Sequence, residues 1–144
     1  MGLGLVAAVH VLPAPHELVQ VLGAELVGIL AQQVQQVRQL GCQVSLDDFG
    51  VGFSSFEYLR MLPVDYVKID GSFIRNMPGN PEDQAIARAI TEVAHATGRE
   101  VIAEFVEGPE HLDWVAKLGI DYAQGLALGE PRPLEEIVDD ADVR

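Results

Sequence analysis

Short apolar runs alternate along the chain with longer segments in which apolar residues recur every three or four positions. A short run of this kind predicts a buried strand, and the longer spacing predicts a helix with one face packed inward. The expected strands are residues 17–22, 43–48, 65–70, 100–104 and 121–124. The expected helices are residues 24–40, 82–97 and 109–118, with short helices through Arg60 and after residue 133.

Glycine and proline mark the ends of several of these elements. Residues 2–11 are expected to be the end of a helix, because Pro13 and Pro15 would break it. Gly41 and Gly119 each follow the last apolar position of an expected helix, where a left-handed residue commonly ends the helix. The regular alternation of strand and helix favours βα units around a parallel sheet.

The length of the chain limits the architecture. A chain of 144 residues can form one domain with a real core, but a complete (β/α)8 barrel takes about 250 residues. We therefore expect residues 1–144 to form a single α/β domain. Its four or five expected strands would make about half of a TIM-like (β/α)8 barrel, with parallel strands alternating with helices.

Composition removes several classes of function. The formal net charge of −13 argues against non-specific binding to nucleic acid or to anionic membranes. No segment is long enough to cross a bilayer. The single cysteine, Cys42, excludes an internal disulfide and fits a reducing cytosol, so we expect a cytoplasmic protein.

Charged and amide side chains stand where the expected strands end. Asp47 and Asp48 close one strand, and Glu104 and Gln124 close two others, while Lys68 lies inside a fourth. The carboxyl ends of the strands of a (β/α)8 barrel open on one face, which is where its chemistry lies. Adjacent aspartates repel each other, and hard divalent cations take carboxylate oxygens as ligands. The pattern therefore predicts a metal site, although a single aspartate at a strand end could equally cap the next helix.

Four motifs occur in an order that resembles the second half of the EAL domain family, the cyclic-di-GMP phosphodiesterases of bacterial signalling. They are Asp47-Asp48-Phe49-Gly50 with the following Gly and Ser-Ser, Pro63-Val64-Asp65 with Lys68-Ile69-Asp70, Ala103-Glu104 with Val106-Glu107, and Gln124-Gly125. The resemblance is strongest over residues 40–133. It implies that the N-terminal half of the barrel is missing from this sequence.

The resemblance implies a two-metal site that holds Mg²⁺ or Mn²⁺ and hydrolyses one phosphodiester of cyclic di-GMP. The implied metal ligands are Asp47, Asp48 and Glu104, with Glu104 also a candidate base and Lys68 orienting the attacking water or a phosphate oxygen. The implied substrate contacts are Gln124, Phe49 and Gly50, and Glu107 would brace the glycine loop. Alternatives stay open: Lys68 could only neutralise the aspartates, Glu107 and Asp70 could cap helices, and Phe49 fits a core position better than a guanine platform.

The sequence also departs from the family. It contains no Glu-Ala-Leu tripeptide, and a further metal-binding glutamate should stand on the strand expected at 17–22. One alignment places Gln20 at that metal position and another places Glu17 there. Phe105 replaces a usual glycine, Val51 a usual threonine and Leu126 a usual aromatic residue.

These departures predict a partial metal site and a chain that is inactive or nearly so when isolated. The alternatives are a non-catalytic module that binds a nucleotide or a protein, or a gene remnant. A half-barrel would expose sheet edges and apolar surface, which predicts a homo-oligomer or a complex with a chain that supplies the missing half.

Overall fold

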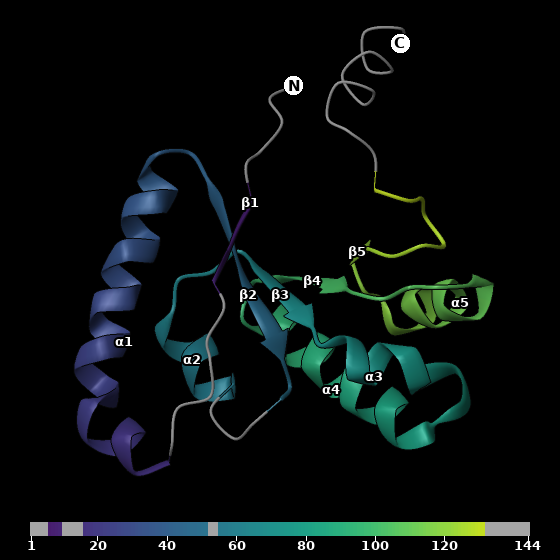
Figure 1. Ribbon diagram of the computed structural model, residues 1–144, viewed down its shortest axis with the longest axis horizontal. Coiled ribbons are helices and arrows are strands. Elements are labelled where there is room, and N and C mark those ends of the chain that lie inside the picture. Colours follow the sequence, from purple (N-terminus) through teal and green to yellow (C-terminus); the bar gives the residue numbers. More distant parts are fainter. Residues whose placement is uncertain (1–5, 10–15, 52–54, 132–144) are drawn as a thin grey trace, which may run out of the picture.

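The structure is a computed structural model that describes residues 6–9, 16–51 and 55–131, with side chains described within 27–51 and 56–131. A five-stranded parallel sheet forms its centre, with the strands side by side in chain order (Figure 1). The strands are β1 (Val6–Val9), β2 (Gln43–Phe49), β3 (Tyr66–Ile69), β4 (Glu100–Ala103) and β5 (Tyr122–Ala123). The predicted parallel α/β class is confirmed.

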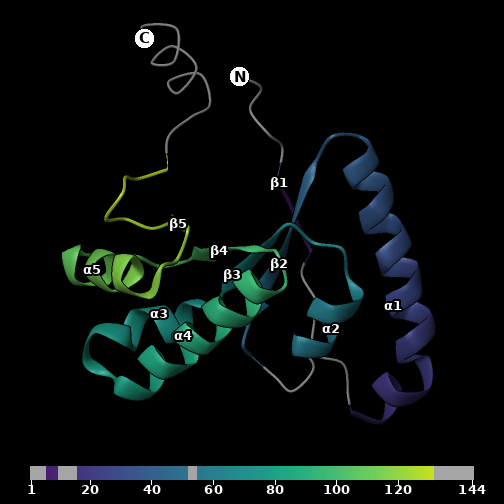
Figure 2. The same cartoon turned by 180° about the vertical axis from the view of Figure 1, so that it is seen from behind.

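Helices connect successive strands and lie in two groups. The helices are α1 (His16–Gln39), α2 (Ser55–Met61), α3 (Gly71–Asn76), α4 (Pro81–Ala96) and α5 (Pro109–Leu118), with a 3-10 turn, η1 (Met77–Gly79). In both views α1 and α2 lie beside β1 and β2, and α3, α4 and α5 gather beside β3 to β5 (Figures 1 and 2). None of the helices in the described part of the chain has the length and apolar character needed to span a bilayer.

Two predictions near the N-terminus are wrong. The expected strand at 17–22 is instead the first part of α1, and the first strand is β1, inside a segment expected to end a helix. A short apolar run does not by itself separate a strand from a buried helix. Residues 16–39 contain no proline and are rich in the good helix formers Leu and Gln, so the helical pattern continues through the run. Val6–Val9 pairs in register with the start of β2. The helix expected after residue 133 lies outside the described residues.

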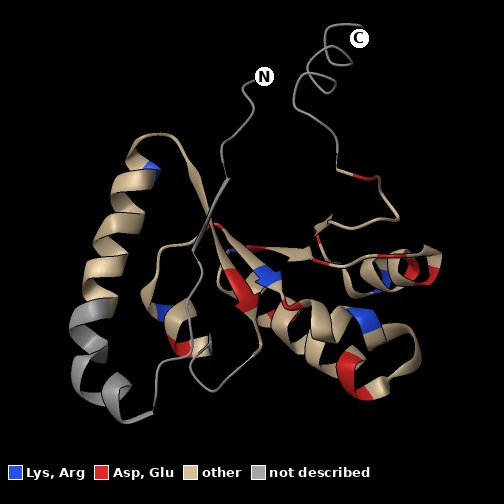
Figure 3. Cartoon of the chain, viewed as in Figure 1, with Lys and Arg blue, Asp and Glu red and all other residues tan. Residues whose placement is uncertain are grey.

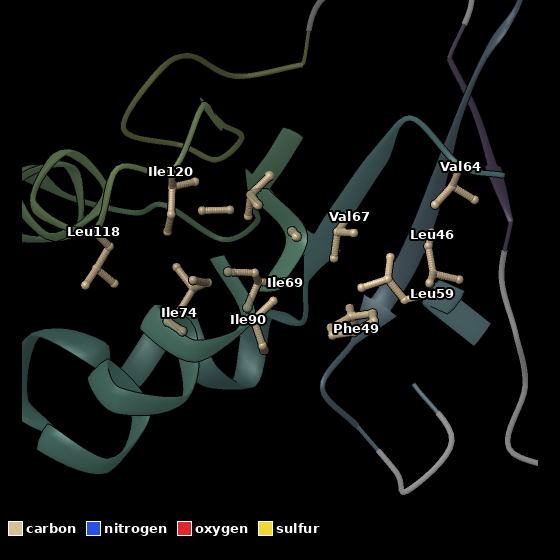
Figure 4. Close-up of a cluster of buried hydrophobic side chains, with 14 of the residues drawn as sticks. Leu46, Phe49, Leu59, Val64, Val67, Ile69, Ile74, Ile90, Leu118 and Ile120 are labelled. Atoms are coloured by element: carbon tan, nitrogen blue, oxygen red, sulfur yellow. The ribbon is translucent and has the colours of Figure 1, made fainter. Parts of the chain in front are cut away.

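The core is built on the central strand. Val67 and Ile69 of β3 are fully buried, and Val101 of β4 is buried beside them. Ile90 of α4 and Leu59 of α2 contribute to the same cluster of apolar side chains (Figure 4). Each such side chain contributes about 1.5–3 kcal/mol on burial, so this cluster fixes the strands whose ends carry the candidate site.

Two aspartates tie the sheet together at the amino ends of the strands. Asp65, just before β3, accepts a hydrogen bond from the Val44 amide at 2.9 Å and forms an ion pair with Arg38 at 2.8 Å. Asp121, just before β5, accepts from the Val101 amide at 2.8 Å and contacts His95 at 2.7 Å. Each carboxylate thus joins the last turn of a helix, the strand that follows it and the next strand.

Candidate metal and phosphate site

A bulge at the end of β2 places two adjacent carboxylates on one edge. Successive side chains of a regular strand point to opposite faces. The register between β2 and β3 shifts between Leu46 and Phe49, and Asp48 adopts a left-handed φ of 51°. Aspartate is among the residues that tolerate this conformation best, at a cost of about 1–3 kcal/mol. The bulge re-aims the strand end, which explains how Asp47 and Asp48 come to serve one site.

Three carboxylates meet at this edge. One oxygen each from Asp47, Asp48 and Glu104 lie within 4.8 Å of one another, and all three residues are partly buried. The expectation that the ends of β2 and β4 bring these groups together is confirmed. Carboxylate oxygens at this spacing suit a hard divalent cation such as Mg²⁺ or Mn²⁺.

Lys68 lies on β3, between the two strands that carry the carboxylates. Its Nζ is 3.2 Å from Asp47 Oδ1 and also forms an ion pair with Glu104. In the charge-coloured view the red end of β2 lies beside the blue stretch of β3 (Figure 3). Burial alone would lower the pKa of Lys68, but the hydrogen bonds and charges of Glu104 and Asp47 outweigh it and raise the pKa above its usual value. The two carboxylates therefore favour the protonated, cationic form of Lys68.

A pocket of about 330 Å³ opens next to the acidic cluster and shares Glu104 with it. Its lining residues are Glu104, Phe105, Glu107, Gln124, Gly125, Leu126, Gly129 and Pro131. Backbone hydrogen bonds hold its walls, because the Val106 amide donates to the Gln124 carbonyl at 3.1 Å and the Ala127 amide donates to the Val106 carbonyl at 2.9 Å. A Cβ on Gly125 would lie 2.3 Å from the Val106 carbonyl oxygen, so the close approach requires glycine.

Phe105 follows Glu104 with a left-handed φ of 55°. Its ring lies against Gly71, where a Cβ would come within 2.0 Å of the ring, and the Arg75 guanidinium lies 3.9 Å from the ring centroid. Sequence reasoning found Phe105 as a departure from the family but missed Gly71 and Arg75. Gly71 and Arg75 lie four residues apart within α3, and α3 itself was not expected.

The other predicted residues fall into distinct settings. Phe49 is 1% exposed and packs edge-on against Phe56, with ring centroids 5.1 Å apart, which favours its core alternative. A Cβ on Gly50 would lie 2.7 Å from the Phe73 ring, so packing alone explains that glycine. Glu107 is exposed at the pocket. The N-cap of α5 is Gly108, so Glu107 does not occupy the cap position of that helix.

Asp70 caps α3, since its side chain accepts the Ser72 amide. Gln20 and Glu17 lie in α1, and not at a strand end, and their side chains lie outside the described part. The assignment of either residue to a metal stays a prediction.

Comparison with known proteins decides the family. The EAL domain profile matches residues 17–131. The chain belongs to the EAL domain family. It is 48% identical over 113 residues to the cyclic di-GMP phosphodiesterase PdeB of Shewanella oneidensis. The aligned segment is 78% of this chain and 13% of that protein. It is also 41% identical over 109 residues to the cyclic di-GMP phosphodiesterase PdeF of Escherichia coli. That aligned segment is 76% of this chain and 15% of PdeF.

Solved EAL domains have the same fold. An EAL domain protein from Listeria monocytogenes superposes with a TM-score of 0.73 at 38% identity, over 82% of this chain and 48% of that one. The PaMucR phosphodiesterase in complex with c-di-GMP superposes with a TM-score of 0.73 at 30% identity, over 92% of this chain and 50% of that one. The present EAL chain therefore spans about half the length of these two solved relatives, as expected for half of a TIM-like barrel.

Proposed function

We propose that this chain carries the metal- and phosphate-binding part of a cyclic-di-GMP phosphodiesterase site. The observation that carries the proposal is the convergence of Asp47, Asp48 and Glu104 around Lys68 at the carboxyl edge of the sheet. The names of the relatives supply the substrate, and the acidic cluster supplies a chemical reason for a metal. An acidic protein can bind a phosphodiester if a metal cation separates the like charges.

Each residue has a role that follows from its setting. Asp47, Asp48 and Glu104 would hold Mg²⁺ or Mn²⁺, which when bound polarises phosphoryl oxygens and makes hydroxide available near neutral pH. Lys68, held protonated by its neighbours, orients a phosphate oxygen or the attacking water. Glu104 is the candidate base because it borders both the cluster and the pocket. Gln124 lines the same pocket, where it would contact the substrate.

We further propose that turnover by this chain alone is at background. The resemblance calls for additional ligands that this sequence does not contain, and only three carboxylates converge among the described residues. Loss of about 4 kcal/mol of transition-state stabilisation already reduces the rate about a thousandfold. A chain that binds cyclic di-GMP without hydrolysing it would act as a regulatory module, which is the second candidate function.

The test measures binding and turnover separately. Binding of cyclic di-GMP is followed by calorimetry in Ca²⁺, and release of linear di-GMP is followed in Mn²⁺, for wild type and for Asp47→Ala. We expect metal-dependent binding that Asp47→Ala abolishes, with no turnover above a buffer control. Rapid turnover that depends on Asp47 would overturn the background-rate proposal, and binding that is equal with and without metal would overturn the metal site.

Assembly and location follow as further parts of this proposal. Leu126 and Leu128 are 63% and 57% exposed, and β1 and β5 are the outer strands of the described sheet. Exposed edges and apolar side chains promote association, so we propose a homo-oligomer or a complex with a chain that supplies further barrel strands. Light scattering at micromolar concentration tests this, and a monodisperse monomer contradicts it. We place the chain in the cytoplasm, where a lone cysteine stays reduced.

A further inference from the structure

We infer that Phe105 is a positioning residue for Glu104: its ring, held against α3, fixes the backbone turn that presents the Glu104 carboxylate to the metal site. The inference deepens the proposed function and rests on it, because it assumes that Asp47, Asp48 and Glu104 bind a divalent cation. In this role Phe105 contacts neither the metal nor a substrate, and acts only through the residue that precedes it.

The backbone is fixed on both sides of Glu104 and Phe105. The Ala103 carbonyl accepts a hydrogen bond from the Gln124 amide at 2.8 Å, and the Val106 amide donates to the Gln124 carbonyl at 3.1 Å. The direction of the Glu104 side chain therefore depends on the short stretch between these two bonds, where Phe105 has a φ of 55°. This conformation is rare for a bulky residue and persists only where surrounding contacts hold it.

The contacts that hold the Phe105 ring come from α3. A Cβ on Gly71 would overlap the ring, and Gly71 is not among the glycines with a positive φ, so packing against the ring explains this glycine. The Arg75 guanidinium, one helical turn further on, lies 3.9 Å from the ring centroid, which is an attractive cation–π contact. His111 Nε2 of α5 lies 3.2 Å from the Arg75 carbonyl oxygen and braces the same end of α3. The ring is therefore held at two positions on one face of a helix that is itself supported.

The element that holds the ring also holds the Glu104 carboxylate. Lys68 of β3 forms an ion pair with Glu104, and α3 begins two residues after β3 ends (Figure 1). Asp70, between the two elements, accepts the Ser72 amide at 2.8 Å and so fixes the start of α3 relative to the strand. One strand–helix unit thus supplies a cation to the carboxylate and a seat for the ring that follows it. A metal ligand placed in advance binds more tightly, because it does not have to be ordered when the metal arrives.

A ring that only fills space predicts a different result. Loss of packing alone would lower the stability of the fold and leave the Mn²⁺ affinity of the folded chain unchanged. Loss of positioning lowers the Mn²⁺ affinity of the folded chain, whatever happens to stability. Phe105→Asn separates the two, because asparagine tolerates a left-handed φ and has no ring to hold the turn.

Mn²⁺ binding, followed by the electron paramagnetic resonance signal of the free ion, tests the inference without substrate or turnover. The affinity is measured well below the melting temperature of each variant, so that every chain is folded. We expect Phe105→Asn to weaken Mn²⁺ binding about tenfold, as the loss of a residue that orients a metal ligand does. Phe105→Tyr keeps the ring and should bind Mn²⁺ as wild type does. Wild-type affinity in Phe105→Asn, or an equal loss in both variants, overturns the inference.

A second pair of variants moves the ring without changing Phe105. Gly71→Ala displaces the ring from its seat and should also weaken Mn²⁺ binding, whereas Gly79→Ala, where a Cβ meets nothing within 4 Å, should not. If Gly71 acts through the ring, Gly71→Ala should cause no further loss in a chain that already carries Phe105→Asn. Losses that add in full would show that Gly71 acts independently of the ring and would overturn the inference.

Failure of this inference is distinguishable from failure of the proposed function. If the metal site is absent, wild type and Asp47→Ala bind Mn²⁺ equally weakly, and both proposals fail. If only the positioning is absent, Asp47→Ala abolishes Mn²⁺ binding and Phe105→Asn binds Mn²⁺ as wild type does.

Discussion

The amino and the carboxyl ends of the strands, here called the amino edge and the carboxyl edge of the sheet, use acidic side chains in opposite ways. At the amino edge Asp65 and Asp121 each accept a backbone amide and contact a basic side chain, so each carboxylate is satisfied where it stands. At the carboxyl edge three carboxylates crowd within 4.8 Å, and one lysine bridges two of them. The amino-edge carboxylates support the fold, and the carboxyl-edge cluster is where we propose that a ligand binds, as expected for the two faces of a barrel.

Removing Lys68 should have the largest effect on this contrast. Lys68→Met leaves three partly buried carboxylates without the cation that bridges Asp47 and Glu104, and we expect a loss of about 3 kcal/mol in the free energy of unfolding. Millimolar Mn²⁺ should restore more stability in this variant than in wild type, because the metal replaces the lost charge.

Denaturant melts with and without metal measure both effects. Lys117→Met, which removes one exposed positive charge from α5 together with its contact over the Trp114 ring, is the control and should cost no more than about 1 kcal/mol. If Lys68→Met is as stable as wild type in the absence of metal, repulsion among the three carboxylates does not destabilise the fold.

The amino edge should behave differently. Asp121→Asn keeps an acceptor for the Val101 amide but loses the charge beside His95, and we expect a loss of about 1–2 kcal/mol that metal does not restore. Burial alone would raise the pKa of Asp121, but the hydrogen bonds from His95 and the Val101 amide lower it. The stabilisation is therefore complete above the unfolded pKa of about 3.9 and is lost as the pH falls through the lowered folded value.

Urea melts of wild type and Asp121→Asn from pH 7 to pH 2 check the sign. The stability gap should close as the pH falls through the acidic range. Asp113→Asn on α5, an exposed position, serves as the control. A gap that widens as the pH falls would contradict the assignment.

The smallest effect is expected at the bulge. Asp48→Gly relieves the left-handed φ of 51° and should raise stability by about 1 kcal/mol, while reducing the shift that Mn²⁺ produces. Asp48→Asn keeps a residue that tolerates this backbone and removes only the charge, so the pair separates strain from repulsion. Thermal melts across a metal titration measure the stability of each variant and the rise in melting temperature that Mn²⁺ produces. If that rise is the same in both variants as in wild type, Asp48 is not part of the metal site.

The pattern of apolar positions predicted the sheet better near the site than at the N-terminus. The runs at 43–48, 65–70, 100–104 and 121–124 correspond to β2 to β5, because each is bounded by glycine, proline or a helix cap. Parallel strands end at one edge, so the meeting of Asp47, Asp48 and Glu104 followed from the same reasoning. The run at 17–22 also lies between Pro15 and Gly23, but it continues a helix, because a helix tolerates an internal glycine at a cost of about 1 kcal/mol.

Contacts between distant segments could not be predicted in the same way. The left-handed conformations of Asp48 and Phe105 depend on how neighbouring strands pair, and periodicity carries no information about pairing. The contact of Phe105 with Gly71 and Arg75 depends on α3, a helix of six residues that is too short to show a pattern. The amino-edge roles of Asp65 and Asp121 were missed because each also fits an ordinary turn residue.

The amino-edge aspartates also bear on how the chain opens. Asp65 links α1, β2 and the start of β3, and Asp121 links α4, β4 and the start of β5. Each carboxylate therefore closes a helix–strand–strand unit whose parts must separate together, which is the property of a cooperative folding unit. The amide hydrogens of Val44 and Val101 are bonded to these carboxylates, so their exchange with solvent reports the opening of each unit. Differences in exchange between the two amides would measure how independently the two ends of the sheet unfold.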